Sequence, residues 1–414
     1  MTSIQYKDFY DEGYKPGEDE LVCEFYIEPA EGLSMEEAAG RVASESSNGT
    51  WSVLDAEQRI KDMSAQAFDV DGNKIKIAYK PIIFEEGNMP QILSCIAGNI
   101  MGMKAVDRIR LMDAEWPESI VKHFKGPRYG SSVKKEIFDV DRPITATVPK
   151  PKVGMTSKQH AQVGYEAWTG GLDLLKDDEN LTGQSFNRFK KRIEKSFKLR
   201  DKAEKETGDK KSYLVNITAD TQTMLERAEM VKDMGGEYIM IDIITTGWAG
   251  LQAVRDKCEE LDLAIHAHRA MHAAFDRIPT HGVSMRCIAQ FARIIGVDQI
   301  HTGTANLGKL ENEDTVGINK WLRKDLHGLN DVLPVASGGL HPGTLPELID
   351  RVGTNIAVQI GGGVHGHPGG TSAGARALRQ AIDAIIDGEK LEDAAENNKE
   401  LSQALDKWGS HSPR

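Results

Sequence analysis

The chain has 414 residues, of which 40% are hydrophobic and 28% charged, and its formal net charge at pH 7 is -12. This composition is typical of a soluble globular protein with an ample core, and the length allows two domains or one large barrel plus a smaller unit. The acidic balance argues against non-specific nucleic-acid binding, and no apolar run approaches the roughly 18 residues of a membrane span. The first residues carry no apolar signal region and the four cysteines have no CxxC spacing, so we expect reduced thiols in a cytoplasmic protein.

Residues 1–124 are predicted to form a small α+β domain. Its elements follow a βαββαβ-like order, typical of ferredoxin-like domains, and Ser34 and Glu37 have the spacing of a helix capping box. The polar stretch from Glu45 to Trp51 contains Asn-Gly, and its spacing alone predicts a connecting loop. The predicted segments are a strand over 21–27, a helix from 34, a strand near 74–85, a helix over 90–101 and a strand near 104–112.

The rest of the chain, residues 125–414, alternates short apolar strands with amphipathic helices that end at glycine. Eight strand–helix units over roughly 280 residues have the rhythm of a (β/α)8 TIM barrel, and a charged helical tail follows. An open doubly wound sheet is the alternative, but it usually has fewer strands and one dominant Gly-rich turn, and the chain has no GxGxxG after the first strand. The predicted strands are Ile144–Val148, Leu172–Leu175, Tyr213–Ile217, Tyr238–Ile243, Ala264–His268, Gln299–Thr302, Leu333–Ala336 and Ile356–Gln359.

In a barrel of this kind, the active site lies at the C-terminal ends of the strands. Six of the eight predicted strands end in titratable side chains or glycine turns. One such end is weak evidence, but six together predict an active site. The six ends are Lys150 to Lys152, Lys176 to Glu179, His268 to His272, His301 to Lys309, Ser337 to Gly339 and Gly361 to Gly363.

The most informative stretch runs from Gly170 to Asn180 and is typical of a strand that enters a loop. With period-2 alternation, Lys176 and Asp178 point to the same side, and Glu179 reaches the same space where the chain turns. Two carboxylates suit a hard cation such as Mg²⁺, which prefers oxygen ligands. A lysine ammonium is not a metal ligand, so Lys176 is either a counter-ion or a nitrogen converted into a group that carries oxygen.

The other strand ends carry groups that suit phosphate binding and proton transfer. Glycine turns after the last two strands expose backbone N–H groups, and barrels often bind phosphate there. Arg269 and His301 could hold a second phosphate, which would imply a bisphosphate substrate. The candidates for acid–base and electrostatic work are Lys150, Lys152, His268, His272 and Lys309, the last in a loop suited to a lid.

Each of these features also has a structural interpretation. Lys150-Pro151-Lys152 taken alone is typical of a solvated loop, and His266 is expected to pack within its strand. Asp242 is expected to be an anion near the metal or the lysines rather than a ligand. The histidines that we expect to shape turns or helix starts are His281, His341 and His367.

Five motifs carry a family resemblance. They are Gly170-Gly-Leu-Asp-Leu-Leu-Lys-Asp-Asp-Glu-Asn180, His266-Ala-His-Arg-Ala-Met-His272, His301-Thr-Gly-Thr304, Pro334-Val-Ala-Ser-Gly-Gly339 and Gln359-Ile-Gly-Gly-Gly363. With these motifs the chain resembles, nearly end to end, the large chain of ribulose-1,5-bisphosphate carboxylase/oxygenase (Rubisco), most of all the archaeal form III group. Residues 45–51, Gly98 and Asn99 also match, which changes the interpretation of 45–51 from a plain loop to a functional one.

The resemblance implies a role for each matching position. Lys176 would take up a CO₂ that is not the substrate, and the resulting carbamate would bind one Mg²⁺ beside Asp178 and Glu179. Lys150, His268 and Lys309 would be the other catalytic residues. The implied substrate-binding residues are Lys152, Arg269, His301, Ser337, Gly338, Gly339, Gln359, Gly361, Gly362, Glu45, Thr50, Trp51 and Asn99. The last four would come from the small domain of a neighbouring chain, which implies a homodimer or an assembly of dimers, with no small subunit expected.

The implied reaction adds CO₂ to the enediolate of ribulose 1,5-bisphosphate and gives two 3-phosphoglycerates, with O₂ as a competitor. The form III likeness suggests that the substrate comes from AMP or nucleoside breakdown. One alternative is a Rubisco-like enolase or isomerase of sulfur salvage, although such proteins usually lose carboxylation residues that are present here. Another is a non-catalytic homologue that binds sugar phosphates. The segment 304–309 is one residue longer than the commonest family loop, which leaves the closed geometry of Lys309 open.

Overall fold

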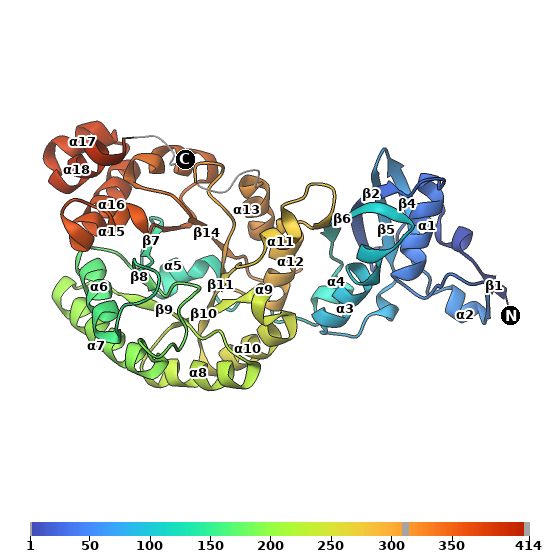
Figure 1. Ribbon diagram of the computed structural model, residues 1–414, viewed down its shortest axis with the longest axis horizontal. Helices are drawn as coiled ribbons and strands as arrows, with labels where there is room; N and C mark the ends of the chain where they lie inside the picture. The colour runs from blue at the N-terminus through green and yellow to red at the C-terminus, as the bar shows by residue number, and fades with distance from the viewer. Residues whose placement is uncertain (1, 309–313, 410–414) are drawn as a thin grey trace. The chain divides into compact units, whose positions relative to one another are not determined.

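The computed structural model describes residues 2–308 and 314–409, which divide into two compact units (Figure 1). The N-terminal unit consists of Met1–Lys125, Met271–Ile295 and Leu326–Leu329. The barrel unit consists of Gly126–Ala270, Gly296–Asp325 and Asn330–Arg414.

The barrel unit is built on a closed barrel of parallel strands in the order β10-β11-β13-β14-β15-β7-β8-β9. The predicted (β/α)8 architecture is therefore confirmed. All eight predicted strands are present, with ends that differ from the prediction by up to two residues. They are β7 (Ile144–Thr147), β8 (Leu174–Lys176), β9 (Ser212–Asn216), β10 (Tyr238–Asp242), β11 (Ala264–His268), β13 (Gln299–His301), β14 (Leu333–Ser337) and β15 (Ala357–Gln359).

The barrel strands are apolar on both faces because both faces are covered. Ala146, Leu174 and Met240 come from three different strands yet share one buried cluster, which places them in the barrel interior. Val358 instead joins a second cluster with Leu378 of the surrounding helical layer. Because both faces of each strand are buried, the strands occur in the sequence as short continuous apolar runs and not as an alternation of apolar and polar residues.

Helices surround the barrel strands (Figure 1). Many end as predicted at glycine, for example α7 at Gly208, whose φ of 76° is the left-handed conformation that glycine adopts most readily. Among the described residues, no helix has both the length and the apolar character that crossing a membrane requires. The main helices of this unit are α6 (Ser157–Thr169), α7 (Phe189–Thr207), α8 (Thr221–Asp233), α10 (Trp248–Leu261), α13 (Thr315–Arg323), α14 (Leu345–Val352), α16 (Gly370–Ile386), α17 (Leu391–Asn397) and α18 (Lys399–Trp408).

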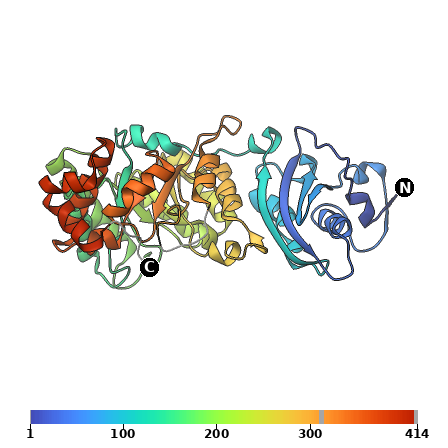
Figure 2. The same cartoon turned by 90° about the horizontal axis from the view of Figure 1, so that it is seen from above.

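The N-terminal unit contains a sheet in the order β12-β6-β2-β5-β4. Helix α1 begins at the predicted capping box of Ser34 and Glu37 and packs on one face of this sheet (Figures 1 and 2). The order β2-α1-β4-β5-α3-β6 is the predicted βαββαβ arrangement. The elements are β2 (Leu21–Pro29), α1 (Met35–Glu45), β4 (Gln66–Asp71), β5 (Lys74–Tyr79), α3 (Met89–Ile96), β6 (Val106–Glu115), β12 (Gly282–Val283) and α12 (Met285–Ile295), with a separate pair of β1 (Thr2–Ile4) and β3 (Leu54–Ala56).

Strand β4 was not located from the sequence, and the strand predicted near 74–85 is shorter than expected. β4 and β5 form a hairpin in which Asp71 pairs with Lys74 across Gly72 and Asn73. Gly72 has a φ of 60°, which a tight hairpin turn requires. The Gly-Asn pair was the sequence signal for this hairpin, but a register shift between Phe68 and Asp71 interrupts the alternation that would have indicated β4.

Candidate active site

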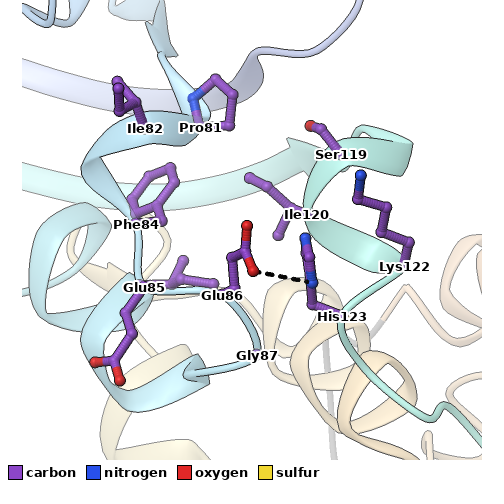
Figure 3. Close-up of a pocket in the computed structure, with 11 residues that line it drawn as sticks. Pro81, Ile82, Phe84, Glu85, Glu86, Gly87, Ser119, Ile120, Lys122 and His123 are labelled. Atoms are coloured by element: carbon purple, nitrogen blue, oxygen red, sulfur yellow. Dashed lines mark ion pairs between the residues drawn. The ribbon is translucent and has the colours of Figure 1, made fainter.

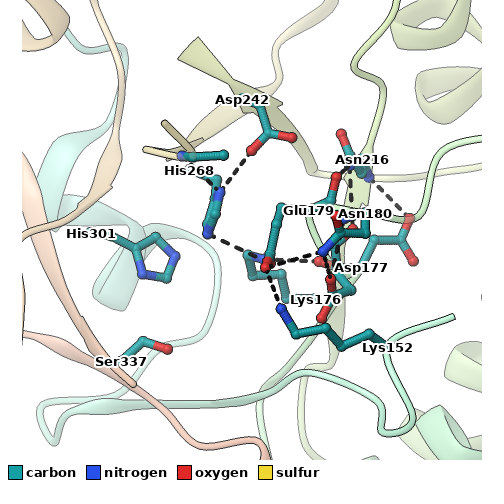
Figure 4. A network of polar contacts seen from close by, with 12 residues as sticks. Lys152, Lys176, Asp177, Glu179, Asn180, Asn216, Asp242, His268, His301 and Ser337 are labelled. Carbon is teal, nitrogen blue, oxygen red and sulfur yellow. Dashed lines mark hydrogen bonds and ion pairs between the residues drawn. The ribbon is translucent and has the colours of Figure 1, made fainter. Parts of the chain in front are cut away.

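The polar residues predicted at the strand ends that the structure describes within the barrel unit lie at one end of the barrel, because neighbouring strands are all parallel. Figure 4 shows the site with side chains from several strand ends, among them Lys152, Lys176, Glu179, His268, His301 and Ser337, together with Asp242 and Asn216. The ones that come from β8 and its following loop form the centre of a polar network.

Two lysines of the loop after β7 pair with the two acids of the loop after β8. Lys150 Nζ lies 2.8 Å from Asp178 Oδ2, and Lys152 Nζ lies 2.8 Å from Glu179 Oε1. Lys176 Nζ is 4.0 Å from Glu179 Oε2 and donates a hydrogen bond of 2.9 Å to the carbonyl of Asp177. Three lysine side chains and two carboxylates therefore share one small space, and the sequence spacing predicts the proximity of Lys176, Asp178 and Glu179 but not the two pairs with Lys150 and Lys152.

The third acid of the stretch, Asp177, faces the other way. It is fully buried, and its carboxylate accepts hydrogen bonds from Tyr213 at 2.5 Å and from Arg192 Nε at 3.2 Å. It also lies 3.1 Å from His160 Nε2 and accepts from the backbone N–H of Asn216 at 3.0 Å. Asp177 thus anchors the end of β8 to β9 and the helical layer, while its neighbours face the site.

The pKa values of Lys176 and Glu179 are both lowered, with different consequences for their charge. Burial lowers the pKa of Lys176, and the charges of Glu179, Asp242 and Asp178 oppose that shift without cancelling it. Burial alone would raise the pKa of Glu179, but the charges of Lys176 and His268 and the hydrogen bond from Lys152 outweigh it and lower the pKa to about 2. The site therefore combines an ionised carboxylate with an amine whose neutral form is favoured more than usual.

His268 is held by Asp242, a pairing that the sequence does not predict, since Asp242 is expected there only as an anion near the metal or the lysines. The Nδ1 atom of His268 lies 2.7 Å from Asp242 Oδ1, and its Nε2 atom lies 3.6 Å from Glu179 Oε2. Burial and the charge of Lys176 lower the pKa of His268. Because Asp242 accepts the Nδ1 proton, the Nε2 atom of the neutral ring is left to face the site.

His301 and His266 lie behind His268. His266 is buried, as expected of a packed strand residue, and its Nε2 atom lies 3.0 Å from His301 Nε2. The rings of His268 and His301 meet edge to face with centroids 4.9 Å apart. Burial lowers the pKa of His301 well below its ordinary value. Arg269 is also buried, and the phosphate role of Arg269 and His301 stays a prediction.

The ends of β14 and β15 meet through side chains and glycines. Gln359 Nε2 donates to Ser337 Oγ at 3.1 Å, so these two predicted substrate residues are neighbours. Gly338 and Gly339 have φ angles of 117° and 85°, which turn the backbone sharply after β14. At Gly361, a Cβ atom would come within 3.1 Å of Lys150 Cε, so this backbone lies directly against the lysine.

The remaining predicted residues belong to other parts of the chain. In the N-terminal unit, Asn99 Nδ2 donates to Glu45 Oε1 at 3.3 Å, and Trp51 is 84% exposed in the loop after α1. Lys309 lies outside the described residues. The N-terminal unit also has a separate cavity of about 370 Å³, where His123 pairs with Glu86 (Figure 3), and no predicted site residue lines it.

The sequence did not single out Asn216 or the anchoring of Asp177. Asn216 ends β9, is fully buried, and its Nδ2 atom reaches the carbonyls of Asp178 and Glu179 at 3.4 and 3.3 Å. A polar residue that ends an apolar strand was the available signal for Asn216. The partners of Asp177 come from β9, α6 and α7 and could not be paired without the fold.

Two family models match the chain. They are the ribulose bisphosphate carboxylase large chain catalytic domain over residues 131–408 and the N-terminal domain of the same chain over residues 8–120. Two proteins named ribulose bisphosphate carboxylase are similar over 99% of this chain. The one from Pyrococcus furiosus is 52% identical with 99% of its length covered, and the one from Archaeoglobus fulgidus is 48% identical with 98% covered.

Solved structures agree with these matches. The octameric ribulose-1,5-bisphosphate carboxylase/oxygenase of Pyrococcus horikoshii has a TM-score of 0.95 at 50% identity, covering 99% of this chain and 98% of that one. The dimeric archaeal Rubisco of Hyperthermus butylicus has a TM-score of 0.91 at 45% identity, covering 98% and 99%. Both domains, the closed barrel and the whole length of the sequence agree, and the chain belongs to the ribulose bisphosphate carboxylase large chain family.

Proposed function

We propose that this chain is a ribulose-1,5-bisphosphate carboxylase. It joins the five-carbon bisphosphate, one CO₂ and one water into two 3-phosphoglycerates, with release of two protons. The observation that carries the proposal is the cluster of Lys176, Asp178 and Glu179 beside Lys150, Lys152 and His268 at the barrel end. Relatives that carry the name ribulose bisphosphate carboxylase and match over the whole chain support it.

The residues present suit a magnesium centre of an unusual kind. Within residues 2–308 and 314–409, no three His, Cys, Asp or Glu side chains gather as a metal site, so Asp178 and Glu179 need a third oxygen donor. Lys176 lies beside Glu179 and can supply one, because its neutral amine can add CO₂ and lose a proton to form a carbamate. Lys176 as carbamate, Asp178 and Glu179 would then hold one Mg²⁺. When bound, Mg²⁺ would stabilise the negative charge that develops on the C2 and C3 oxygens of the substrate.

The chain's own side chains supply the proton transfers. Lys150 would move a proton at the C2 side of the enediolate, and Lys152 would add positive charge beside it. The contacts of Lys150 with Asp178 and of Lys152 with Glu179 support these roles. His268 presents Nε2 toward Glu179 and is oriented by Asp242, so it can take or give a proton at the hydrated carbon. O₂ would compete with CO₂ for the same enediolate, which makes the chain an oxygenase as well.

Two groups of residues would hold the two phosphates. Gly339, Gly361 and Gly362 offer backbone N–H groups at the ends of β14 and β15, and Arg269 with His301 lies beside β11 and β13. Ser337 would bind a substrate hydroxyl. A neighbouring copy of the chain would complete the site with Glu45, Thr50, Trp51 and Asn99, so the smallest active form would be a homodimer. The octameric and dimeric relatives support an assembly of this type.

The test is product analysis with ¹⁴C-labelled CO₂, ribulose 1,5-bisphosphate and Mg²⁺. We expect the label to appear in 3-phosphoglycerate, with two molecules formed for each bisphosphate consumed. An enolase or isomerase would convert its phosphate ester without incorporating label, and a binding protein would bind the bisphosphate without turnover. Either of these results would contradict the proposal. The salvage origin of the substrate and the cytoplasmic location stay predictions.

A further inference from the structure

The side chain of His365 joins β7, the strand that precedes Lys150, to helix α16. Its Nε2 atom lies 2.9 Å from Thr147 Oγ1 at the end of β7, and its Nδ1 atom lies 3.1 Å from Thr371 Oγ1 in the first turn of α16. His365 is the last residue of the short helix α15 (Gly362–His365), which follows β15. The ring therefore ties this turn to the neighbouring strand and to the next helix.

The hydrogen bonds fix the tautomer of the ring. Thr147 Oγ1 donates its single proton to the carbonyl of Ile360 at 2.6 Å, so it can only accept from His365. Nε2 of His365 must then carry the proton, and Nδ1 of the neutral ring accepts from Thr371. Burial and the charge of Lys150 lower the pKa of His365 to about 4, which keeps the ring in this neutral form.

The turn that His365 ties down is the one that faces Lys150. The backbone N–H of His365 donates to the carbonyl of Gly361 at 3.0 Å, so the two ends of the turn are joined. A Cβ atom on Gly361 would come within 3.1 Å of Lys150 Cε and 3.8 Å of its Nζ. A rotation of α15 would therefore move the Gly361 backbone relative to the ammonium of Lys150.

We infer that His365 is a positioning residue for substrate binding: by bridging Thr147 and Thr371 it holds the Gly361 turn against Lys150. The inference rests on the proposed function, because Gly361 and Lys150 then meet the bisphosphate. His365 acts through the turn and does not itself take part in proton transfer to the substrate.

The experiment compares His365→Leu with the wild-type enzyme in its assembled form. We expect the KM for ribulose 1,5-bisphosphate to rise about tenfold, the scale of a lost buried hydrogen bond, while kcat changes less than about threefold. His365→Gln keeps an N–H that can reach Thr147 and should restore KM to within about threefold of wild type. If His365→Leu does not fold, Thr371→Val removes one partner alone and should raise KM in the same direction.

His367→Leu is the matched control. His367 lies two residues beyond His365, just after α15, and is buried, but its Nε2 atom pairs with the carbonyl of Glu400. We expect this variant to lower the thermal stability as His365→Leu does and to leave KM unchanged. Equal KM values for both variants and the wild type would overturn the inference, and so would a His365→Gln variant that keeps the full rise in KM.

Binding of ribitol 1,5-bisphosphate separates this inference from the proposed function, because it needs no turnover. We expect His365→Leu to bind this unreactive analogue about tenfold more weakly than wild type. Weaker binding in a chain that fixes no CO₂ would contradict the proposed function alone. Unchanged binding in a chain that does fix CO₂ would contradict the inference alone.

Discussion

At the scale of single residues, Asp177 and Asp178 are neighbours in the chain, but their side chains face opposite sides and make different contacts. Asp178 faces Lys150, whereas Asp177 faces Arg192, His160 and Tyr213 on the outer side of β8. Burial alone would raise the pKa of Asp177, but the charge of Arg192 and the hydrogen bond to His160 reverse this and lower the pKa to about 2. The strand can thus present Lys176 and Asp178 rigidly because the residue between them is anchored.

We expect His365 to make the stability of the protein depend on pH, which a melting temperature can measure. Burial, together with the charges of Lys150 and His160, lowers its pKa from 6.5 to about 4. Between these values the unfolded chain binds the proton and the folded chain does not, so stability is lost as the pH falls from 6.5 to about 4. We expect the melting temperature of the wild type to fall more over this range than that of His365→Gln. Parallel curves for the two proteins would contradict this expectation.

The sequence could predict Lys176, Asp178 and Glu179 because their spacing alone puts two acids and a lysine on one side of a strand end. It could not predict that Lys150 and Lys152 each pair with one of those acids, because the pairs join positions 28 and 27 residues apart. Such pairs become visible only when β7 and β8 are known to be adjacent. The family resemblance predicts the role of each of these residues, and the fold shows the distances between their side chains.

At the scale of elements, Asp173 fastens β7 to β8 at the end opposite the site. Arg142 pairs with its carboxylate through two hydrogen bonds of 2.7 Å, and Thr145 donates to it through N–H and hydroxyl, each at 2.8 Å. Asp173 lies in the same motif, Gly170 to Asn180, as Lys176, yet it precedes β8 rather than following it. Residues at this end of a barrel serve stability rather than catalysis.

Replacement of Asp173 tests whether this end of the barrel serves stability and not catalysis. Asp173→Asn leaves Arg142 without its buried counter-charge, and we expect a loss of about 3 kcal/mol in the free energy of unfolding of the barrel unit. The KM for ribulose 1,5-bisphosphate and the requirement for CO₂ and Mg²⁺ should stay as in the wild type. Denaturant unfolding and steady-state kinetics measure the two quantities. A large rise in KM with little loss of stability would contradict the assignment. The control is Asp220→Ala at the exposed start of α8, which removes a helix N-cap and is expected to cost only about 1 kcal/mol.

The barrel strands could be predicted because each is a short apolar run bounded by glycine or charge. The hairpin of β4 and β5 was missed for a physical reason, since the bulge between Phe68 and Asp71 breaks the two-residue period. Strand β12 has only two residues and pairs in parallel with β6, which is too short for any pattern to indicate. The composition of a segment is therefore enough to predict that a regular strand exists, but it does not predict strands that pair irregularly or are very short.

At the scale of the whole molecule, we propose that each active site contains residues from two copies of the chain. Glu45 and Asn99 are joined in the N-terminal unit, while Lys176 belongs to the barrel unit. If the site forms between copies, a barrel defect and an N-terminal defect can complement each other. The chain's own sequence predicts this only through the family resemblance, because no pattern within one chain specifies which copy supplies a residue.

Mixing two inactive variants tests the shared site. We expect Lys176→Ala and Glu45→Gln to be inactive alone and to recover about a quarter of the wild-type activity after dissociation and reassembly together, because half of the dimers are mixed and each has one intact site. The rate of ¹⁴CO₂ fixation measures the recovery. A mixture that stays as inactive as its components would contradict a site shared between chains.

The central claim is that Lys176 becomes the third oxygen donor of a magnesium centre. The most direct measurement is the initial rate of ¹⁴CO₂ fixation, with and without incubation in CO₂ and Mg²⁺ before ribulose 1,5-bisphosphate is added. We predict that this incubation raises the rate of the wild type and of the surface control Lys158→Ala, and that Lys176→Ala fixes CO₂ at least about a hundredfold more slowly under either protocol. Full carboxylase activity in Lys176→Ala would contradict the account.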